Sequence, residues 1–138
     1  MAEPKNVDDV ETVDLVSSAS DDAEWVGGFF FYGGSGADKS VIISFKVPPG
    51  KRLGKHIDTA EETQFILAGS GDLLLYDGPK PIRAGDVIVL KENEAHDLHN
   101  TGSEDLHVIG FFSAPQVEQH WDTEVWDGDK VTGSPNRG

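Results

Sequence analysis

The part of the chain between Trp25 and Phe112 contains no stretch with the apolar period of an amphipathic helix. It is divided instead into short runs rich in β-branched and aromatic residues, which turn signals such as Gly69-Ser70-Gly71 separate. We expect strands within residues 25–32, 41–47, 55–58, 62–68, 72–76, 86–90, 95–100 and 106–112. Many short strands with regular turns predict an all-β sandwich or barrel.

The flanking segments differ from this central part. Residues 1–24 carry eight acidic side chains against Lys5 alone, and residues 113–121 are compatible with a helical turn or two. We therefore expect an acidic N-terminal arm (1–24), a β-barrel (25–112) and a C-terminal extension (113–138) whose residues 131–138 are frayed. The arm is either a solvated, partly disordered segment or, through its weak series of apolar residues, an edge strand or a crossing to a partner subunit.

Composition excludes several classes of function. With 11 basic and 25 acidic residues the net charge is −14, which repels nucleic-acid phosphates, so we expect no nucleic-acid partner. No apolar run approaches the ~20 residues of a membrane helix, so we expect no membrane partner. The N-terminus has neither the basic start nor the apolar core of a secretory signal, which favours a cytoplasmic protein. The absence of cysteine excludes disulfides and thiolate chemistry.

Potential metal ligands stand at strand spacing in two glycine-bracketed stretches. His56 and Asp58 are two residues apart, Glu62 follows after a short break, and His96 comes from a later predicted strand. Alternate residues of a strand point to the same face, so His56 and Asp58 both face inward, with Cα atoms about 7 Å apart. A mixture of imidazole and carboxylate suits a divalent transition metal.

These stretches resemble the two motifs of the cupin family, G-x5-H-x-H-x3-E-x6-G and G-x5-P-x-G-x2-H-x3-N. Gly50, His56, Glu62 and Gly69 are in register with the first motif, and Gly85, His96 and Asn100 with the second. The chain departs from the pattern at Asp58, which replaces the usual second histidine, and at Lys91 and Asn93, which replace the proline and the second glycine. The resemblance implies the double-stranded β-helix, or jelly-roll barrel, that cupins share.

The resemblance also implies one divalent transition metal per subunit, Fe, Mn, Ni or Zn, held by His56, Asp58, Glu62 and His96. Asp58 either binds the ion, directly or through a water molecule, or caps the turn that follows it. The alternative for His56, Glu62 and His96 is a buried polar group in which the side chains satisfy one another.

Other residues are candidates for the substrate pocket. Gln64 shares the inward parity of Glu62 and either orients a substrate oxygen or bonds to nearby backbone; it is also the candidate for a catalytic role beyond the metal. Ile66 and Leu98 are expected to form the pocket wall. His120 and Trp121 cover the pocket as a lid if the tail folds back, and otherwise pack on the surface.

The function that these features favour is that of a small metal-binding cupin enzyme acting on a small organic molecule inside the barrel. A dioxygenase using Fe or Mn is the leading hypothesis. Isomerase, lyase and decarboxylase chemistries use the same scaffold, and a non-catalytic cupin that binds a small molecule is a further alternative. Open strand edges favour pairing of two copies, so we expect a homodimer.

Overall fold

The computed structural model describes residues 2–126 of the chain and consists almost wholly of β-strands. The elements are, in chain order, the 3-10 helix η1 (Val7–Asp9) and the strands β1 (Val13–Val16), β2 (Glu24–Gly33), β3 (Gly36–Ala37), β4 (Val41–Val47), β5 (His56–Asp58), β6 (Glu62–Ala68), β7 (Ser70–Leu75), β8 (Gly78–Arg83), β9 (Val87–Leu90), β10 (Asp97–His99), β11 (Leu106–Phe112) and β12 (Gln119–Trp121). The prediction of an all-β fold is confirmed. None of the described helices is long and apolar enough to cross a membrane.

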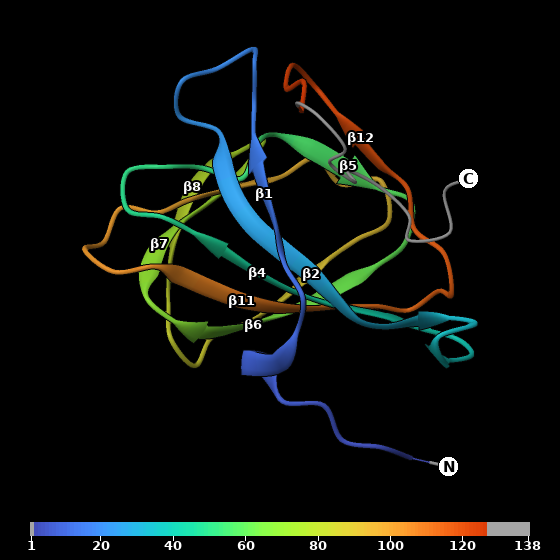
Figure 1. Cartoon of the computed structure of the whole chain (residues 1–138). Helices are drawn as coiled ribbons and strands as arrows, with labels where there is room; N and C mark the ends of the chain where they lie inside the picture. The colour runs from blue at the N-terminus through green and yellow to red at the C-terminus, as the bar shows by residue number, and fades with distance from the viewer. Residues whose placement is uncertain (1, 127–138) are drawn as a thin grey trace.

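One large sheet forms a wall of the barrel. Its strands follow the order β1-β2-β4-β11-β6-β9, and β3 pairs with β2. Alternation decides which side chains enter the barrel: in β11, Leu106, Val108 and Phe112 are buried, whereas Phe111 between them is exposed. Figure 1 shows this sheet crossing the view, with β2, β4, β11 and β6 side by side.

Two smaller sheets complete the barrel. One has the order β10-β7-β8, and the other pairs β12 with β5. Figure 1 shows β12 and β5 together at one end of the molecule. A backbone bridge joins His56 to His96, with two N–H···O bonds of 3.0 Å, and so connects β5 to the segment that leads into β10.

The main apolar core lies between the sheets. Its buried members are Leu15, Trp25, Phe45, Val47, Leu53, Ile66, Leu73, Ile82, Leu90, Leu98, Leu106 and Val108. These residues come from both walls, and full burial of such a side chain stabilises the fold by about 1.5–3 kcal/mol each. The core therefore fixes the two sheets against each other and, with them, the polar groups that share the inner face.

Residues from both predicted extensions pair with the barrel. In the N-terminal segment β1 runs antiparallel to β2, and Leu15 is only 1% exposed. The helical turns predicted within residues 113–121 are wrong, because residues 119–121 form β12 instead. Tertiary contacts override the weak helical preference: Val117 is buried in a second apolar cluster, and the Thr59 N–H donates to the Glu118 carbonyl. The predicted frayed residues 131–138 lie outside the described part.

Strand β8 occupies a segment that the sequence marks as a turn, since Gly78 and Pro79 are turn-forming residues. It pairs with β7 and is the outer strand of its sheet. Proline is tolerated on an edge strand because its missing N–H can face away from the neighbouring strand. Pro79 and Pro81, two residues apart, therefore do not prevent pairing.

Candidate metal centre

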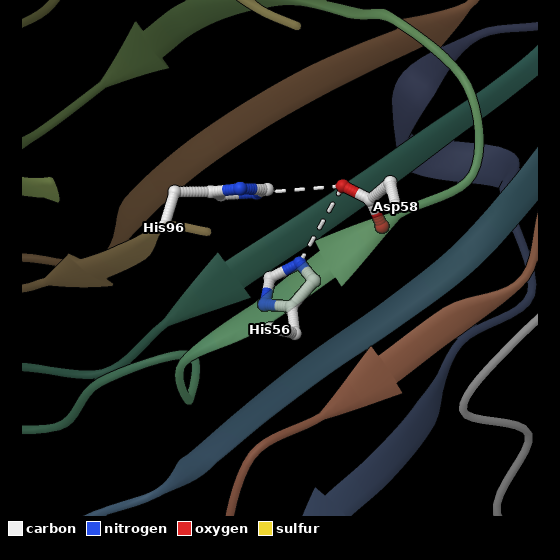
Figure 2. A group of neighbouring side chains, drawn as sticks. All are labelled: His56, Asp58 and His96. Carbon is white, nitrogen blue, oxygen red and sulfur yellow. Dashed lines mark ion pairs between the residues drawn. The ribbon is translucent and has the colours of Figure 1, made fainter. Parts of the chain in front are cut away.

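Three buried side chains from two segments meet inside the barrel. His56 and Asp58 lie on β5, and His96 immediately precedes β10. Asp58 Oδ2 lies 3.6 Å from His56 Nε2 and 3.4 Å from His96 Nε2. Figure 2 shows one carboxylate oxygen of Asp58 facing both imidazole rings. One ligand atom from each residue lies within 4.8 Å of the others, a spacing that suits a single metal ion.

The backbone fixes the orientation of both imidazoles. His56 Nδ1 lies 2.7 Å from the Gly54 carbonyl oxygen, and His96 Nδ1 lies 2.9 Å from that of Glu94. A carbonyl only accepts, so Nδ1 carries the proton in each ring, and the Nε2 lone pair of the neutral ring faces Asp58. Burial lowers the pKa of both His56 and His96 to about 4, so both rings are neutral near pH 7.

Asp58 brings negative charge into this apolar surrounding. Burial raises its pKa to about 6, and neighbouring His96 and the side chain of Gln119 oppose that rise. The Gln119 amide approaches without completing a hydrogen bond, because among the described residues neither Asp58 carboxylate oxygen nor His96 Nε2 has a partner in hydrogen-bond geometry. The cluster thus places acceptors against acceptors, an arrangement that a bound cation would satisfy.

Glu62, at the start of β6, lies next to the three residues. Its Oε1 is 3.9 Å from His96 Nε2 and accepts a 3.0 Å hydrogen bond from Gln64 Nε2. Burial, followed by repulsion from Asp58, raises the Glu62 pKa well above its usual value. The four residues named from the sequence are therefore brought together, and Gln64 holds the Glu62 carboxylate in place.

Gly110 gives Glu62 the space that it occupies. A Cβ atom at Gly110 would overlap Glu62 Oε2 and would lie 3.0 Å from Ile43 Cγ1. Sequence reasoning missed this residue. The available signal was a glycine at an inward position of an apolar strand, because glycine inside a strand often marks the close approach of another group.

Strand β12 covers one side of the cluster. Its register opposes Trp121 to His56 and Gln119 to Asp58, so both side chains face inward. The Trp121 and His56 rings are 4.3 Å apart between centroids, with 33° between their planes. His120 lies on the opposite face, where its exposed ring is 3.4 Å from the Glu118 carboxylate. The structure therefore brings Trp121 to the site but not His120, and it adds Gln119, which sequence reasoning missed.

The residues expected to form the pocket wall are placed differently. Ile66 and Leu98 are completely buried in the main apolar core. An apolar cavity adjoins the cluster on the side of β2 and β4. Ile66, Leu98 and Gln64 are not among the residues that line it. Inward parity was correct for all three residues, but parity does not show how far along the barrel a side chain lies.

A second buried polar cluster centres on Arg52. Its guanidinium donates to Asp22 at 2.9 Å, to Asp97 at 3.3 Å and to Glu124 at 2.8 Å. Burial alone would raise the pKa of Glu124, but hydrogen bonds with Ser20, Ser17 and Arg52 lower it overall. This cluster ties the segment before β2 and the segment after β12 to the loop that precedes β5.

Comparison with known proteins places this geometry in context. Residues 43–112 match the family described as Cupin domain. The oxalate-binding protein of Thermotoga maritima is 40% identical over 72 residues, which are 50% of this chain and 58% of that protein. Protein SchB of Streptomyces halstedii is 31% identical over 103 residues, 72% of this chain and 75% of that protein.

A solved structure resembles nearly the whole described chain. The polyketide cyclase RemF from Streptomyces resistomycificus superposes with a TM-score of 0.69 at 20% identity, covering 94% of this chain and 89% of its own. At that identity the likeness shows a shared fold. The sequence and structural comparisons thus agree on the same architecture.

Proposed function

Because this chain belongs to the cupin family, whose double-stranded β-helix its strands form, we propose that it is a metal-dependent enzyme acting on a small organic molecule inside the barrel. The observation that carries this proposal is the buried cluster of acceptors. Two imidazole Nε2 atoms face one carboxylate oxygen at 3.4 and 3.6 Å, and no described residue completes a hydrogen bond to that oxygen. A divalent cation is the group that this set of donor atoms fits.

His56, Asp58 and His96 would hold the ion, with Glu62 as a fourth ligand. Four protein ligands would leave two positions of an octahedral ion open for a substrate oxygen and a second small molecule. The hydrogen bonds from the two Nδ1 atoms and from Gln64 keep the ligands oriented before the ion binds.

Within this scheme we propose dioxygenase chemistry with Fe or Mn. Two imidazoles and carboxylates with open positions are typical of non-haem Fe(II) sites. The ion would supply a binding site for O₂ and substrate together, and it would polarise the substrate oxygen. The chain's own contribution is to orient the ligands, to exclude water with Trp121 and to place the Gln119 amide beside the reacting groups.

Decarboxylation or another lyase reaction is the second candidate. Its support is the likeness to a solved structure described as a predicted oxalate decarboxylase from Thermotoga maritima, with 25% identity and a TM-score of 0.68. A bound cation would also draw electrons from a substrate carboxylate in this chemistry. The 40% identity to the Thermotoga oxalate-binding protein, of which this chain spans 58%, supports a third interpretation, a cupin that binds a small molecule without transforming it.

The test of the metal site is metal analysis of protein purified without added metal and then loaded with Fe(II), Mn(II) or Zn(II). Wild-type protein should retain about one ion per chain. His96→Ala should weaken binding by more than about 100-fold, beyond the 10- to 100-fold effects of outer partners. His120→Ala, the same change at an exposed histidine, is the matched control and should retain the ion. Failure of the wild-type protein to retain any of these ions would remove the proposal.

A second measurement tests for the open metal positions that oxygenase chemistry requires. Nitric oxide binds open positions on Fe(II) and gives a characteristic electron paramagnetic resonance signal. We expect that signal from Fe(II)-loaded wild-type protein, because four protein ligands leave positions open. Fe(II)-loaded protein without the signal would favour non-redox chemistry on a closed or differently coordinated ion.

We also propose that the enzyme is a homodimer. The outward side chains of β6, β9 and β11 form an apolar face in which Phe65, Leu67, Val87, Val89 and Phe111 are 41–62% exposed. β9 ends the path of the large sheet. With a net charge of −14, other surfaces of two copies repel each other, whereas this face can pack against its own copy. Sedimentation should show a dimer, and Val87→Lys should make it monomeric.

A further inference from the structure

The cavity beside the metal centre has apolar walls. It encloses about 230 Å³. Its apolar lining includes Leu15, Trp25, Phe29, Ile43, Phe112 and Val117. They come from β1, β2, β4, β11 and the segment before β12, so residues outside the region matched by the Cupin domain complete it. Gly27 also lines the cavity, and its missing side chain gives room to the Trp25 ring, which a Cβ atom at this position would overlap.

The cavity reaches the candidate metal ligands through shared residues. Ile43 lines it, and the Cβ position of Gly110 would contact both Ile43 and the Glu62 carboxylate. Phe112 lines it as well, and Phe112 is the register partner of Glu62 across β11 and β6. On the other side Gln119 lines the cavity and pairs in register with Asp58. Asp58 and Glu62 do not line the cavity, but the residues paired with them in register do, so a molecule in the cavity has one end next to the strands that carry the carboxylates.

The charges in the lining limit what can bind. No lysine, arginine or histidine is among the described residues that line the cavity, and its one charged side chain is the exposed Glu11. A dicarboxylate or a phosphate ester would bring charge into apolar walls with no cationic side chain to pair it. In metal-free protein the Asp58 and Glu62 carboxylates beyond the inner end would add repulsion, whereas a bound cation would offset it.

The size of the space points to ring systems. An engineered apolar cavity of about 150 Å³ is large enough to bind benzene. A cavity of about 230 Å³ therefore has room for a second fused ring. The rings of Trp25, Phe29 and Phe112 offer aromatic surfaces to it.

Resting on the proposed metal-dependent function, we infer that the substrate is an uncharged, mainly aromatic molecule of about two fused rings that carries a hydroxyl or carbonyl oxygen at one end. The rings lie between β2, β4 and Val117. The oxygen lies beside Gln119, whose amide can both donate and accept a hydrogen bond, and Gln119 pairs in register with Asp58, which would hold the ion.

The test uses 2-naphthol, which is uncharged at neutral pH, and oxalate as competing chemical classes. Isothermal titration calorimetry is run on the full chain, both free of metal and loaded with Mn(II). We expect 2-naphthol to bind both forms with a Kd on the order of 0.1 mM or tighter. To the metal-free form it should bind at least about tenfold more tightly than oxalate, because no bound ion can chelate oxalate there. Oxalate binding to the metal-free form as tightly as 2-naphthol, or more tightly, would overturn the inference.

Variants connect the binding to this cavity. Val41 lines it, and Val41→Phe should fill it and weaken 2-naphthol binding at least about tenfold. Val16→Phe makes the same change at an exposed position of β1 that is not a lining residue and should leave binding unchanged. Undiminished binding by a folded Val41→Phe protein would contradict the assignment.

A second variant covers the case in which Val41→Phe does not fold. Val41→Ala enlarges the cavity and should raise the affinity for the three-ring 2-anthrol relative to 2-naphthol by about tenfold. An unchanged ratio would overturn the inference. Binding of 2-naphthol by a wild-type protein that never retains a metal would instead remove the metal-dependent function and leave the ligand class of the cavity standing.

Discussion

The two buried polar clusters of this barrel differ in how hydrogen-bond donors and acceptors are arranged. Around Arg52, a guanidinium with five N–H donors meets the carboxylates of Asp22, Asp97 and Glu124, so donors face acceptors and opposite charges meet. Around Asp58, lone pairs of two neutral imidazoles face a carboxylate, so acceptors face acceptors. In the first arrangement each carboxylate has a cationic donor within the chain, and the cluster holds segments together. The second has no such donor among the described residues, and the proposed cation would supply the missing positive charge.

The largest expected effect tests the first cluster. Arg52→Met keeps much of the side-chain volume but leaves the buried carboxylates of Asp97 and Glu124 without their cation. Removing one partner of a buried ion pair costs about 3–5 kcal/mol, and we expect a loss of unfolding free energy near the lower end because Arg52 is 20% exposed. Urea unfolding measures it. A loss below about 1 kcal/mol would show that the cluster does not hold the segments together.

The next substitution, at Asp58, should raise the unfolding free energy instead of lowering it. In metal-free protein, Asp58→Asn replaces a buried carboxylate with an amide that can donate to His96 Nε2, so we expect a gain of about 1–3 kcal/mol in unfolding free energy. The pKa of Asp58 is raised from 3.8 to about 6, so its charge penalises the fold increasingly as pH rises through this range. The advantage of the variant should therefore be small near pH 4 and full above about pH 6. The same substitution removes a proposed metal ligand, so the variant should also lose metal binding.

Chelator-treated samples of both proteins, melted at several pH values, measure this gain. The matched control is Asp122→Asn, the same change at an exposed aspartate, which should leave the stability nearly unchanged at every pH. A loss of stability in metal-free Asp58→Asn at pH 7 would show that the carboxylate is satisfied within the chain, and the contrast between the clusters would fail.

A smaller effect concerns the pH dependence of the first cluster. Glu124→Gln should cost about 1.5 kcal/mol at pH 7, the lower end of the value of a hydrogen bond to a charged group. The folded-state pKa of Glu124 lies below its ordinary value of 4.5. Its contribution is therefore fully present above the unfolded pKa and is lost as pH falls through the lower folded pKa. The difference in unfolding free energy between wild type and variant should shrink below about pH 4.5. A difference that widens on acidification would contradict a lowered pKa of Glu124 in the folded protein.

The smallest expected change in unfolding free energy comes from an exposed ion pair, and it provides a baseline for the other substitutions. Lys55 and Asp122 form an ion pair of 3.9 Å in which both side chains are 59% exposed. Solvent screens such a pair, so Lys55→Ala should change the unfolding free energy by less than about 0.5 kcal/mol. A clearly larger loss by urea unfolding would mean that exposed charges also fasten the C-terminal segment, and the distinction drawn for Arg52 would weaken.

The sequence predicted the parts of the site that are encoded locally. His56, Asp58, Glu62 and His96 were identifiable because strand alternation and motif spacing are short-range properties. Gln119 was not identified as an inward residue, and Trp121 was identified only as a lid if the tail folded back. Their orientation depends on the register between β12 and β5, which lie far apart in the chain. The cavity also has a different lining from the predicted pocket, because β1, β2 and Val117 come together only in the tertiary fold.

The position of β12 after all the other strands has a consequence for how the protein is made. A ribosome releases the chain from its N-terminus, so His56, Asp58 and His96 emerge before Trp121 can stack on His56. During synthesis the proposed metal site is therefore uncovered on this side, and ions would reach it freely. Docking of β12 covers that side, so the timing of this step would influence which ion the proposed site takes up.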